Sequence, residues 1–240
     1  MIPAKLQKLM AQAGHGSRRA CEQIVREGRV TVNGERAKLG LRADPAVDEI
    51  LVDGNRLEAA EPLTYILLHK PRGVLSSARS QGGWPTVTEL VEAPARVYPV
   101  GRLDLESEGL VLLTNDGELA NRLTHPRFGH EKEYRVLLER VPSEDQIRIW
   151  REGVTLADLR RTAPARVELE SGTGADPWLR VVLNEGMKRQ IRETALALGL
   201  QVKRVIRIRM GELSLGDLEP GNWRNLTDRE IIRLRSELEK

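Results

Sequence analysis

Three short stretches of this 240-residue sequence carry side chains whose types and spacing suit chemistry. In GRLDLESEGL (101–110) the carboxylate of Asp104 lies in a turn-like segment just before an apolar run. In EKEYRV (131–136) Tyr134 lies at the entry to a strand-like alternation, and in MKRQIR (187–192) cations recur at helical spacing. A carboxylate that is fixed in one pose can act as a weak base or as a nucleophile, which makes Asp104 the first residue to explain.

Each stretch also has a purely structural interpretation. An aspartate before an apolar strand is commonly a turn or cap residue, a strand tyrosine can be an ordinary aromatic, and a basic helix face can be merely solvated. The helical face weakens the last of these, because Lys188 and Arg192 are four residues apart and face away from Ile191. A further run of cations follows and extends the expected anion-binding surface: Lys203, Arg204, Arg207 and Arg209.

Charge is segregated along the chain. The formal net charge is only +3, although charged residues make up 30% of the sequence. Residues 1–42 hold nine Lys or Arg against three Glu, whereas residues 43–62 hold six acidic residues against one Arg. Two basic surfaces that are far apart in the sequence predict binding of an extended polyanion.

The residue types argue against several classes of site. The single cysteine excludes an internal disulfide and suits the reducing cytoplasm, and four histidines without His-Glu-x-x-His spacing predict no metal site. The glycine fingerprints for nucleotides and the Gly-x-Ser-x-Gly elbow are missing, so ATP, NAD and serine-hydrolase chemistry are not expected. The sequence also has no run approaching the roughly 18 apolar residues of a membrane span and no signal-peptide core, which predicts neither membrane insertion nor export.

The elements that must position these side chains are expected in two domains, residues 1–60 and residues 61–240. Ala59-Ala60-Glu61-Pro62 has no apolar period and is interpreted as the linker between them. The first domain is expected to be a small module of two helices followed by strands that enter Asn-Gly and Asp-Gly turns. The predicted helices and strands are 6–13, 17–28, 30–32 and 50–52.

Strands and helices mix without regular alternation in the second domain. This predicts an α+β fold with a mixed, largely antiparallel sheet. Capping-box spacing predicts helices that begin at Ser143 and Thr227, and apolar spacing predicts another over 187–198. The expected strands are 65–68, 133–138, and a hairpin of 164–170 with 178–183 across the turn-rich SGTGADP.

At five places, in order, the sequence resembles ribosomal-RNA pseudouridine synthases. The stretches are HKPRGVLS (69–76), GRLDLESEGL (101–110), LTNDGELANRL (113–123), EKEYRV (131–136) and EGMKRQIR (185–192). The N-terminal LQKLMAQAGHGSRRACEQIVREGRVTVNG resembles the αL RNA-binding module, a small fold shared with a small-subunit ribosomal protein, tRNA synthetases and several RNA-modifying enzymes. Gly-Arg-Leu-Asp alone would be a weak signal, but five stretches in order behind that module make the resemblance specific.

The resemblance implies an enzyme that isomerises uridine to pseudouridine with no cofactor. The N1 glycosidic bond breaks, the uracil turns, and C5 joins C1′ of the same ribose. The resemblance makes Asp104 the catalytic aspartate and Arg192 its positive partner, which would keep a carboxylate ionised inside a pocket. It makes Tyr134 the pocket tyrosine that packs against the extruded uracil or accepts a proton. Attack on C1′, attack on the base and a glycal route all stay open.

The remaining cations are expected to bind RNA. The resemblance places Arg102 in the space that the extruded base leaves. For Lys132 it leaves three roles open: contact with a phosphate, support of the pocket wall, or a solvated side chain. For the first domain the alternative is ion pairing with Glu22, Glu27 and the acidic residues of 43–62. The expected RNA-binding residues are Arg18, Arg19, Arg26, Arg29, Arg102, Lys132, Lys188 and Arg189.

Two other functions compete with this interpretation. A non-catalytic rRNA-binding assembly factor would keep the basic surfaces without needing Asp104, Tyr134 and Arg192 together. A glycoside hydrolase would need a second carboxylate, and nothing marks Glu106 or Glu108 as that acid. The first domain resembles the large-subunit members more than the small-subunit enzyme, so the expected partner is large-subunit (23S) rRNA, free or in an assembling particle, acted on by a monomer.

Overall fold

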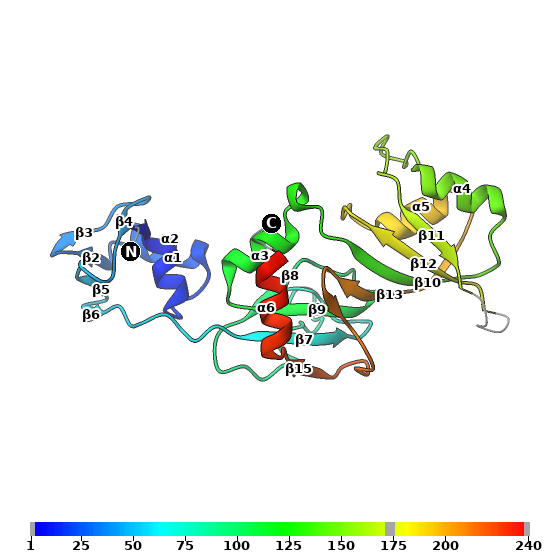
Figure 1. Ribbon diagram of the computed structural model, residues 1–240. Coiled ribbons are helices and arrows are strands. Elements are labelled where there is room, and N and C mark those ends of the chain that lie inside the picture. Colours follow the sequence, from blue (N-terminus) through cyan, green and yellow to red (C-terminus); the bar gives the residue numbers. More distant parts are fainter. Residues whose placement is uncertain (1–2, 171–175, 238–240) are drawn as a thin grey trace. The chain divides into compact units, whose positions relative to one another are not determined.

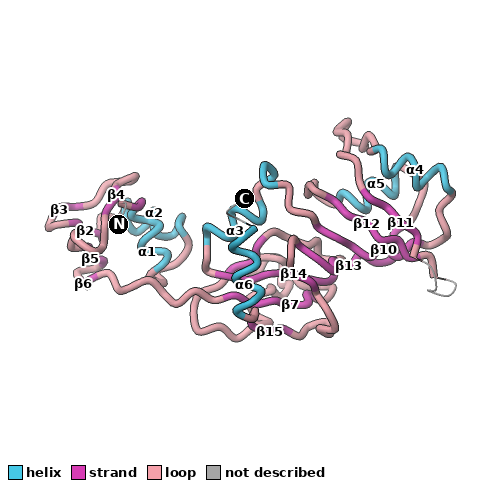
Figure 2. Tube along the Cα trace, in the orientation of Figure 1, coloured by secondary structure: helices cyan, strands magenta, loops and turns pink. Residues whose placement is uncertain are grey.

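The computed structural model describes residues 3–170 and 176–237, and it divides the chain into two compact units. Unit 1 consists of Met1–Leu63 with Ala93–Arg96, and unit 2 consists of Thr64–Glu92 with Val97–Lys240. Figure 1 shows the order of the elements, and Figure 2 shows where the helices and strands lie in each unit. Among the described residues, no helix is long and apolar enough to cross a membrane.

Unit 1 is built from two short helices and a small antiparallel sheet. The Ser17 hydroxyl caps the second helix by accepting a hydrogen bond from the Ala20 amide. Asn33 and Gly34 both have positive φ and form the two-residue hairpin turn that their types favour. The predicted helices and strands of this domain are therefore confirmed. The elements are β1 (Ala4–Lys5), α1 (Leu6–Gln12), α2 (Arg18–Arg26), β2 (Val30–Val32), β3 (Glu35–Arg36), β4 (Arg42–Ala43), β5 (Ile50–Val52) and β6 (Asn55–Arg56).

Unit 2 is organised by a nine-stranded sheet. The strand order is β11-β12-β10-β13-β9-β7-β15, with β14 paired to β13 and β8 paired to β9. Among the named strands of the described residues only β9 and β13 pair in parallel, which confirms the mixed, largely antiparallel sheet. The strands are β7 (Tyr65–Lys70), β8 (Tyr98–Val100), β9 (Glu108–Thr114), β10 (Lys132–Leu138), β11 (Arg166–Leu169), β12 (Trp178–Leu183), β13 (Val202–Met210), β14 (Leu213–Ser214) and β15 (Trp223–Asn225).

Helices flank this sheet. Both predicted capping boxes are present, at Ser143 with Gln146 and at Thr227 with Glu230. The predicted hairpin is the β11–β12 pair, and residues 171–175 of its turn lie outside the described residues. The helical elements are α3 (Gly117–Thr124), the short 3₁₀ helix η1 (Pro126–Phe128), α4 (Glu144–Glu152), α5 (Gln190–Ala197) and α6 (Asp228–Glu237).

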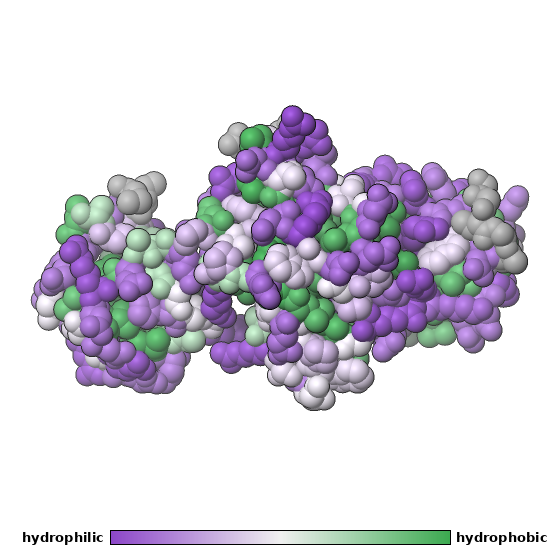
Figure 3. Space-filling view, turned by 90° about the horizontal axis from the view of Figure 1, so that it is seen from below, coloured by the Kyte–Doolittle hydropathy of each residue, from purple (hydrophilic) through white to green (hydrophobic). Residues whose placement is uncertain are grey.

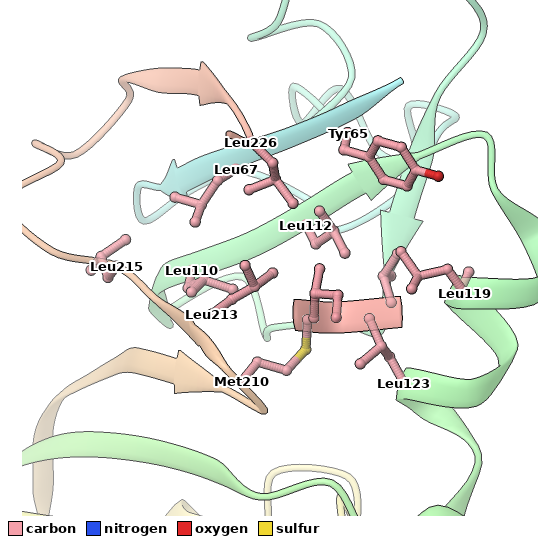
Figure 4. Close-up of a cluster of buried hydrophobic side chains, with 13 residues drawn as sticks. Tyr65, Leu67, Leu110, Leu112, Leu119, Leu123, Met210, Leu213, Leu215 and Leu226 are labelled. Atoms are coloured by element: carbon pink, nitrogen blue, oxygen red, sulfur yellow. The ribbon is translucent and has the colours of Figure 1, made fainter. Parts of the chain in front are cut away.

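The core of unit 2 fixes the strands that lead to the candidate site. Side chains from β7 and β9 pack with Leu119 and Leu123 of α3 and with Leu234 of α6 (Figure 4). Every residue of β7 and β9 is buried; the apolar runs 65–68 and 110–113 predict this for the middle of the strands, whereas the buried polar residues lie at their ends. Hydrophilic side chains cover most of the face drawn in Figure 3, in keeping with the 30% of charged residues. The rigid β9 thus begins where the Asp104 turn ends.

Candidate active site

A pocket of about 320 Å³ in unit 2 gathers seven of the predicted site residues. Its walls come from the loop before β9, the segment between α3 and β10, the loop before α5, and the strands β10 and β13. Stretches that are far apart in the sequence therefore meet around one cavity. The predicted residues that line it are Arg102, Asp104, Lys132, Tyr134, Lys188, Arg189 and Arg192.

The loop that carries Asp104 is held through its backbone. The Ser76 hydroxyl lies 3.0 Å from both the amide nitrogen and the carbonyl oxygen of Leu103. The Gly73 amide donates to the Leu105 carbonyl, and the Ser107 amide donates to the Asp104 carbonyl at 3.0 Å. The Asp104 carboxylate accepts no hydrogen bond from the described residues, and the side chain is only partly buried. A rigid turn therefore presents a carboxylate to the pocket with its oxygens available.

Lys70 is a positioning residue that the sequence analysis quoted within HKPRGVLS but did not single out. Its side chain is fully buried, and its Nζ donates to the carbonyl oxygens of Ser107 at 2.7 Å, Pro71 at 2.8 Å and Leu105 at 3.4 Å. Burial lowers the pKa of Lys70 to about 8, against the attraction of nearby carboxylates. A sequence signal that could have identified Lys70 is its place at the end of an apolar strand. A lysine buried there needs hydrogen-bond acceptors nearby, because an unpaired buried charge costs free energy.

Gly109 has a specific reason to be glycine. Its φ is +109°, and a Cβ at this position would overlap the backbone of Arg207, which pairs with Gly109 in the parallel β9–β13 ladder. Glycine alone allows both the backbone conformation and the close approach. The Gly of GRLDLESEGL thus brings β13 against the base of the Asp104 loop.

Tyr134 and Lys132 lie on β10 and face the same pocket. Tyr134 is opposite Arg207 in the β10–β13 register and is 8% exposed. Lys132 is partly buried and donates from Nζ to the His130 carbonyl at 2.9 Å. Burial lowers the pKa of Lys132, and the positive charge of Arg207 lowers it further. These two side chains add a phenol and a cation to the pocket that Asp104 also lines.

Arg192 ties α5 to the Asp104 loop. Its guanidinium donates to the Glu106 carbonyl and to the Val202 carbonyl, both at 3.2 Å. Burial and the charge of Arg189 lower the pKa of Arg192, whereas Asp104 raises it. Within the described part of the chain no ion pair of 4 Å or less joins Arg192 to Asp104, so its direct contact is with the loop backbone.

The start of the predicted helix over 187–198 is wrong. The helix α5 begins at Gln190, and Arg189 before it has a left-handed backbone with φ of +55°. Gln190 folds back onto the Met187 amide and the Glu185 carboxylate, which holds residues 185–190 as a loop. Lys188 and Arg189 are therefore exposed cations of a pocket-lining loop and do not continue a helical stripe with Arg192.

The predicted basic surface over 203–209 is also wrong in most of its members. Arg204 forms a bidentate ion pair with Glu108, and Arg209 pairs with Glu133. Arg207 is 2% exposed. Carboxylates on the neighbouring strands β9 and β10 neutralise Arg204 and Arg209 across the sheet, and these pairs join residues that are far apart in the sequence.

The predicted RNA-binding residues of unit 1 divide into two groups. Arg18, Arg19 and Arg26 are exposed, and Arg18 lines a groove with Lys5, Lys8 and Arg42. Arg29 instead forms a bidentate ion pair with Asp53, at 2.6 and 2.7 Å, and also contacts Glu27. The alternative of internal pairing thus holds for Arg29 in this structure.

The pocket offers acid–base and electrostatic chemistry. One available carboxylate, one phenol and several cations surround a cavity of a size that suits a nucleotide-sized group. In the described part of the chain, no group of three or more His, Cys, Asp or Glu side chains is arranged to hold a metal ion.

Comparisons with known proteins agree on one family. The model of the RNA pseudouridylate synthase family matches residues 64–197, and the model of the S4 domain matches residues 5–47. An uncharacterized RNA pseudouridine synthase of Aquifex aeolicus is 39% identical over 98% of this chain and 94% of its own length. The ribosomal large subunit pseudouridine synthase B of Bacillus subtilis is 39% identical over 97% of this chain and 96% of its own.

The solved structures agree with the sequence relatives. A crystal structure of a pseudouridylate synthase has a TM-score of 0.69 and 30% sequence identity, and the match covers 96% of this chain and 99% of that one. The similarity extends over both units of the chain.

Proposed function

The chain belongs to the RNA pseudouridine synthase family, and from this premise we propose that it converts specific uridines of large-subunit ribosomal RNA to pseudouridine. Relatives named ribosomal large subunit pseudouridine synthase B, 39% to 41% identical, support the choice of substrate. The S4 domain and its exposed arginines support an RNA partner. In this proposal unit 1 supplies affinity and unit 2 carries out the isomerisation.

We assign the catalytic carboxylate to Asp104. The observation that carries this assignment is that seven residues from separate stretches surround one pocket, in which the Asp104 oxygens accept no hydrogen bond from the described residues. A carboxylate can serve as a nucleophile toward an oxocarbenium-like sugar or as a weak base. Attack on C1′, attack on the base and a glycal route all use a carboxylate so placed.

The other pocket residues receive supporting roles. Tyr134 packs against the extruded uracil or accepts the proton that leaves C5 when C5 joins C1′. Arg192 holds the Asp104 loop through the Glu106 carbonyl and adds positive charge close to Asp104. Arg102 is exposed at the pocket and suits the space that the base vacates when it leaves the stack.

The test is chemical mapping of pseudouridine in ribosomal RNA from cells that lack this protein. Deproteinised RNA and assembly intermediates are incubated with the wild type or with Asp104→Ala, and both subunits' RNAs are mapped. We expect a new site in large-subunit RNA with the wild type only. A site in small-subunit RNA would refute the substrate choice, and no Asp104-dependent site in any sample would favour a non-catalytic binding factor.

A further inference from the structure

Arg207 is a buried cation that no carboxylate of the described residues neutralises. It lies in the middle of β13, is 2% exposed, and lines the pocket. Its Nε donates to the Leu110 carbonyl at 2.8 Å, whereas its buried Nη2 has no hydrogen-bond partner among the described residues. A buried guanidinium nitrogen without an acceptor costs free energy, so its retention calls for a reason.

The neighbouring arginines of the same strand are an internal comparison. Arg204 is held by both oxygens of Glu108, and Arg209 is held by Glu133 and Glu131. Arg207 is more deeply buried than either of them, yet no ion pair of the described residues includes it. The strand therefore provides carboxylates for the arginines outside the pocket and none for the arginine that faces it.

The surroundings of Arg207 add positive charge. The cations of Lys132 and Lys70 are close enough for Arg207 to lower the pKa of both. Gly109 admits the Arg207 backbone at the base of the Asp104 loop, and Tyr134 lies opposite Arg207 in the sheet. A group that brings negative charge or an acceptor oxygen into this pocket would satisfy Nη2 and relieve the repulsion.

We propose that Arg207 binds the uracil of the target nucleotide, with Nη2 donating a hydrogen bond to a ring carbonyl oxygen, and that it stabilises the anionic uracil formed when the glycosidic bond breaks. This inference rests on the proposed function. Heterolysis of the N1–C1′ bond leaves its electron pair on N1, and the charge spreads to O2 and O4 of the ring. The electron pair returns to carbon when C5 bonds to C1′, after which C5 loses its proton and N1 gains one.

The burial of Arg207 favours contact with an extruded base over contact with a backbone phosphate. A phosphate of the backbone stays with the sugar chain and meets exposed cations such as Arg102 and Lys188 at the pocket. A side chain that is 2% exposed is reached by a flat group that enters the pocket, and an extruded base is such a group. A cation that is already fixed in place before the reaction, with a free hydrogen-bond donor, also stabilises negative charge that develops in a transition state.

The experiment compares Arg207→Met and Arg207→Lys with the wild type in the full chain. The substrates are an RNA with the mapped uridine and the same RNA with 5-fluorouridine, whose base is the more acidic leaving group. Single-turnover loss of the parent nucleoside is followed by mass spectrometry, with RNA affinity and thermal unfolding measured alongside. Arg204→Met is the matched control, because it removes a guanidinium from the same strand outside the pocket.

We expect Arg207→Met to slow loss of uridine by roughly 100-fold with little change in RNA affinity, as for loss of one donor to a developing anion. The 5-fluorouridine RNA should recover most of that loss, and Arg207→Lys should fall between. Arg204→Met should leave the ratio of the two substrates at the wild-type value.

An equal loss of rate on both substrates would show that Arg207 is structural, and a wild-type rate for Arg207→Met would also overturn the inference. If Arg207→Met does not fold, the substrate ratio of Arg207→Lys decides. Failure of the wild type to convert uridine would instead refute the proposed function.

Discussion

The basic side chains of the two units are held in different ways. In unit 1 the cations that line the groove are exposed, and Arg18 and Arg19 lie at the first turn of α2 with solvent around them. In unit 2 Lys70 and Arg207 are buried and bind backbone carbonyls at fixed distances. Exposed cations attract a polyanion with little geometric demand, whereas buried ones fix atoms in place. In the function that we propose, such exposed cations of unit 1 supply affinity, whereas the buried Lys70 and Arg207 of unit 2 supply positioning.

The largest effect is expected from Gly109→Ala, because the added Cβ would prevent the close approach of the β9 and β13 backbones at Gly109 and Arg207. The new Cβ would overlap the Arg207 backbone, and the alanine would have to adopt a φ of +109°. The free energy of unfolding should fall by about 3 kcal/mol, with loss of conversion. Gly216→Ala is the control, because φ there is also positive but the space is open, and its cost should be about 1 kcal/mol. Equal costs in chemical denaturation would show that the close approach does not matter.

Lys70→Met tests positioning by a buried cation. The loop of Asp104 would lose the contacts of its Leu105 and Ser107 carbonyls with Nζ, so the single-turnover rate should fall about 100-fold, with RNA affinity nearly unchanged. Lys8→Met is the corresponding change in the unit 1 groove and should weaken RNA binding without slowing the bound enzyme. If both variants lose rate, or both lose affinity, the two units do not use their cations differently.

The lowered pKa of Lys70 predicts that the free energy of unfolding depends on pH. Its pKa in the folded chain is about 8, below the ordinary 10.5, so between these values the unfolded chain binds more protons. The contribution of Lys70 to the free energy of unfolding should therefore rise between pH 8 and pH 10.5, by on the order of 3 kcal/mol. Denaturation of the wild type and of Lys70→Met across this range measures it, and the rise should be smaller in the variant. Parallel pH profiles would contradict the assignment.

The smallest effects are expected in unit 1. Arg19→Ala should weaken RNA binding several-fold and lower the salt slope by about one, because each phosphate contact releases about one counterion. Arg29→Ala should change RNA affinity less, since its guanidinium is already engaged by Asp53 and Glu27. Binding titrations at several salt concentrations distinguish the two variants, and a larger effect for Arg29→Ala would reverse this ranking.

Local patterns predict the elements of this chain well. Turn types such as Asn33-Gly34 and the Ser143 capping box determine structure within a few residues, so the sequence alone places them. The seven predicted residues that line the pocket were found through ordered motifs. Neither the partners of Arg204 and Arg209 nor the burial of Arg207 could be found this way, because they depend on which strands become neighbours in the sheet.

The start of α5 shows the same limit at shorter range. Residues 187–189 fit a helical period, but the side chain of Gln190 bonds to Glu185 and to the Met187 amide, so that 187–189 form a loop and the helix begins only at Gln190. Lys70 was missed for another reason. A lysine in a strand is usually assigned to the surface, and only the converging carbonyls of a distant loop make its burial favourable.

The most direct test of the account is to compare Asp104→Asn with the wild type on the same ribosomal RNA, measuring affinity and single-turnover formation of pseudouridine. Asparagine keeps the size and polarity of the side chain but removes its negative charge and basicity. We predict affinity within about twofold of the wild type and conversion lowered at least about 1000-fold, the scale of losing the reacting group. Appreciable conversion by Asp104→Asn would contradict the central claim that the Asp104 carboxylate performs the chemistry.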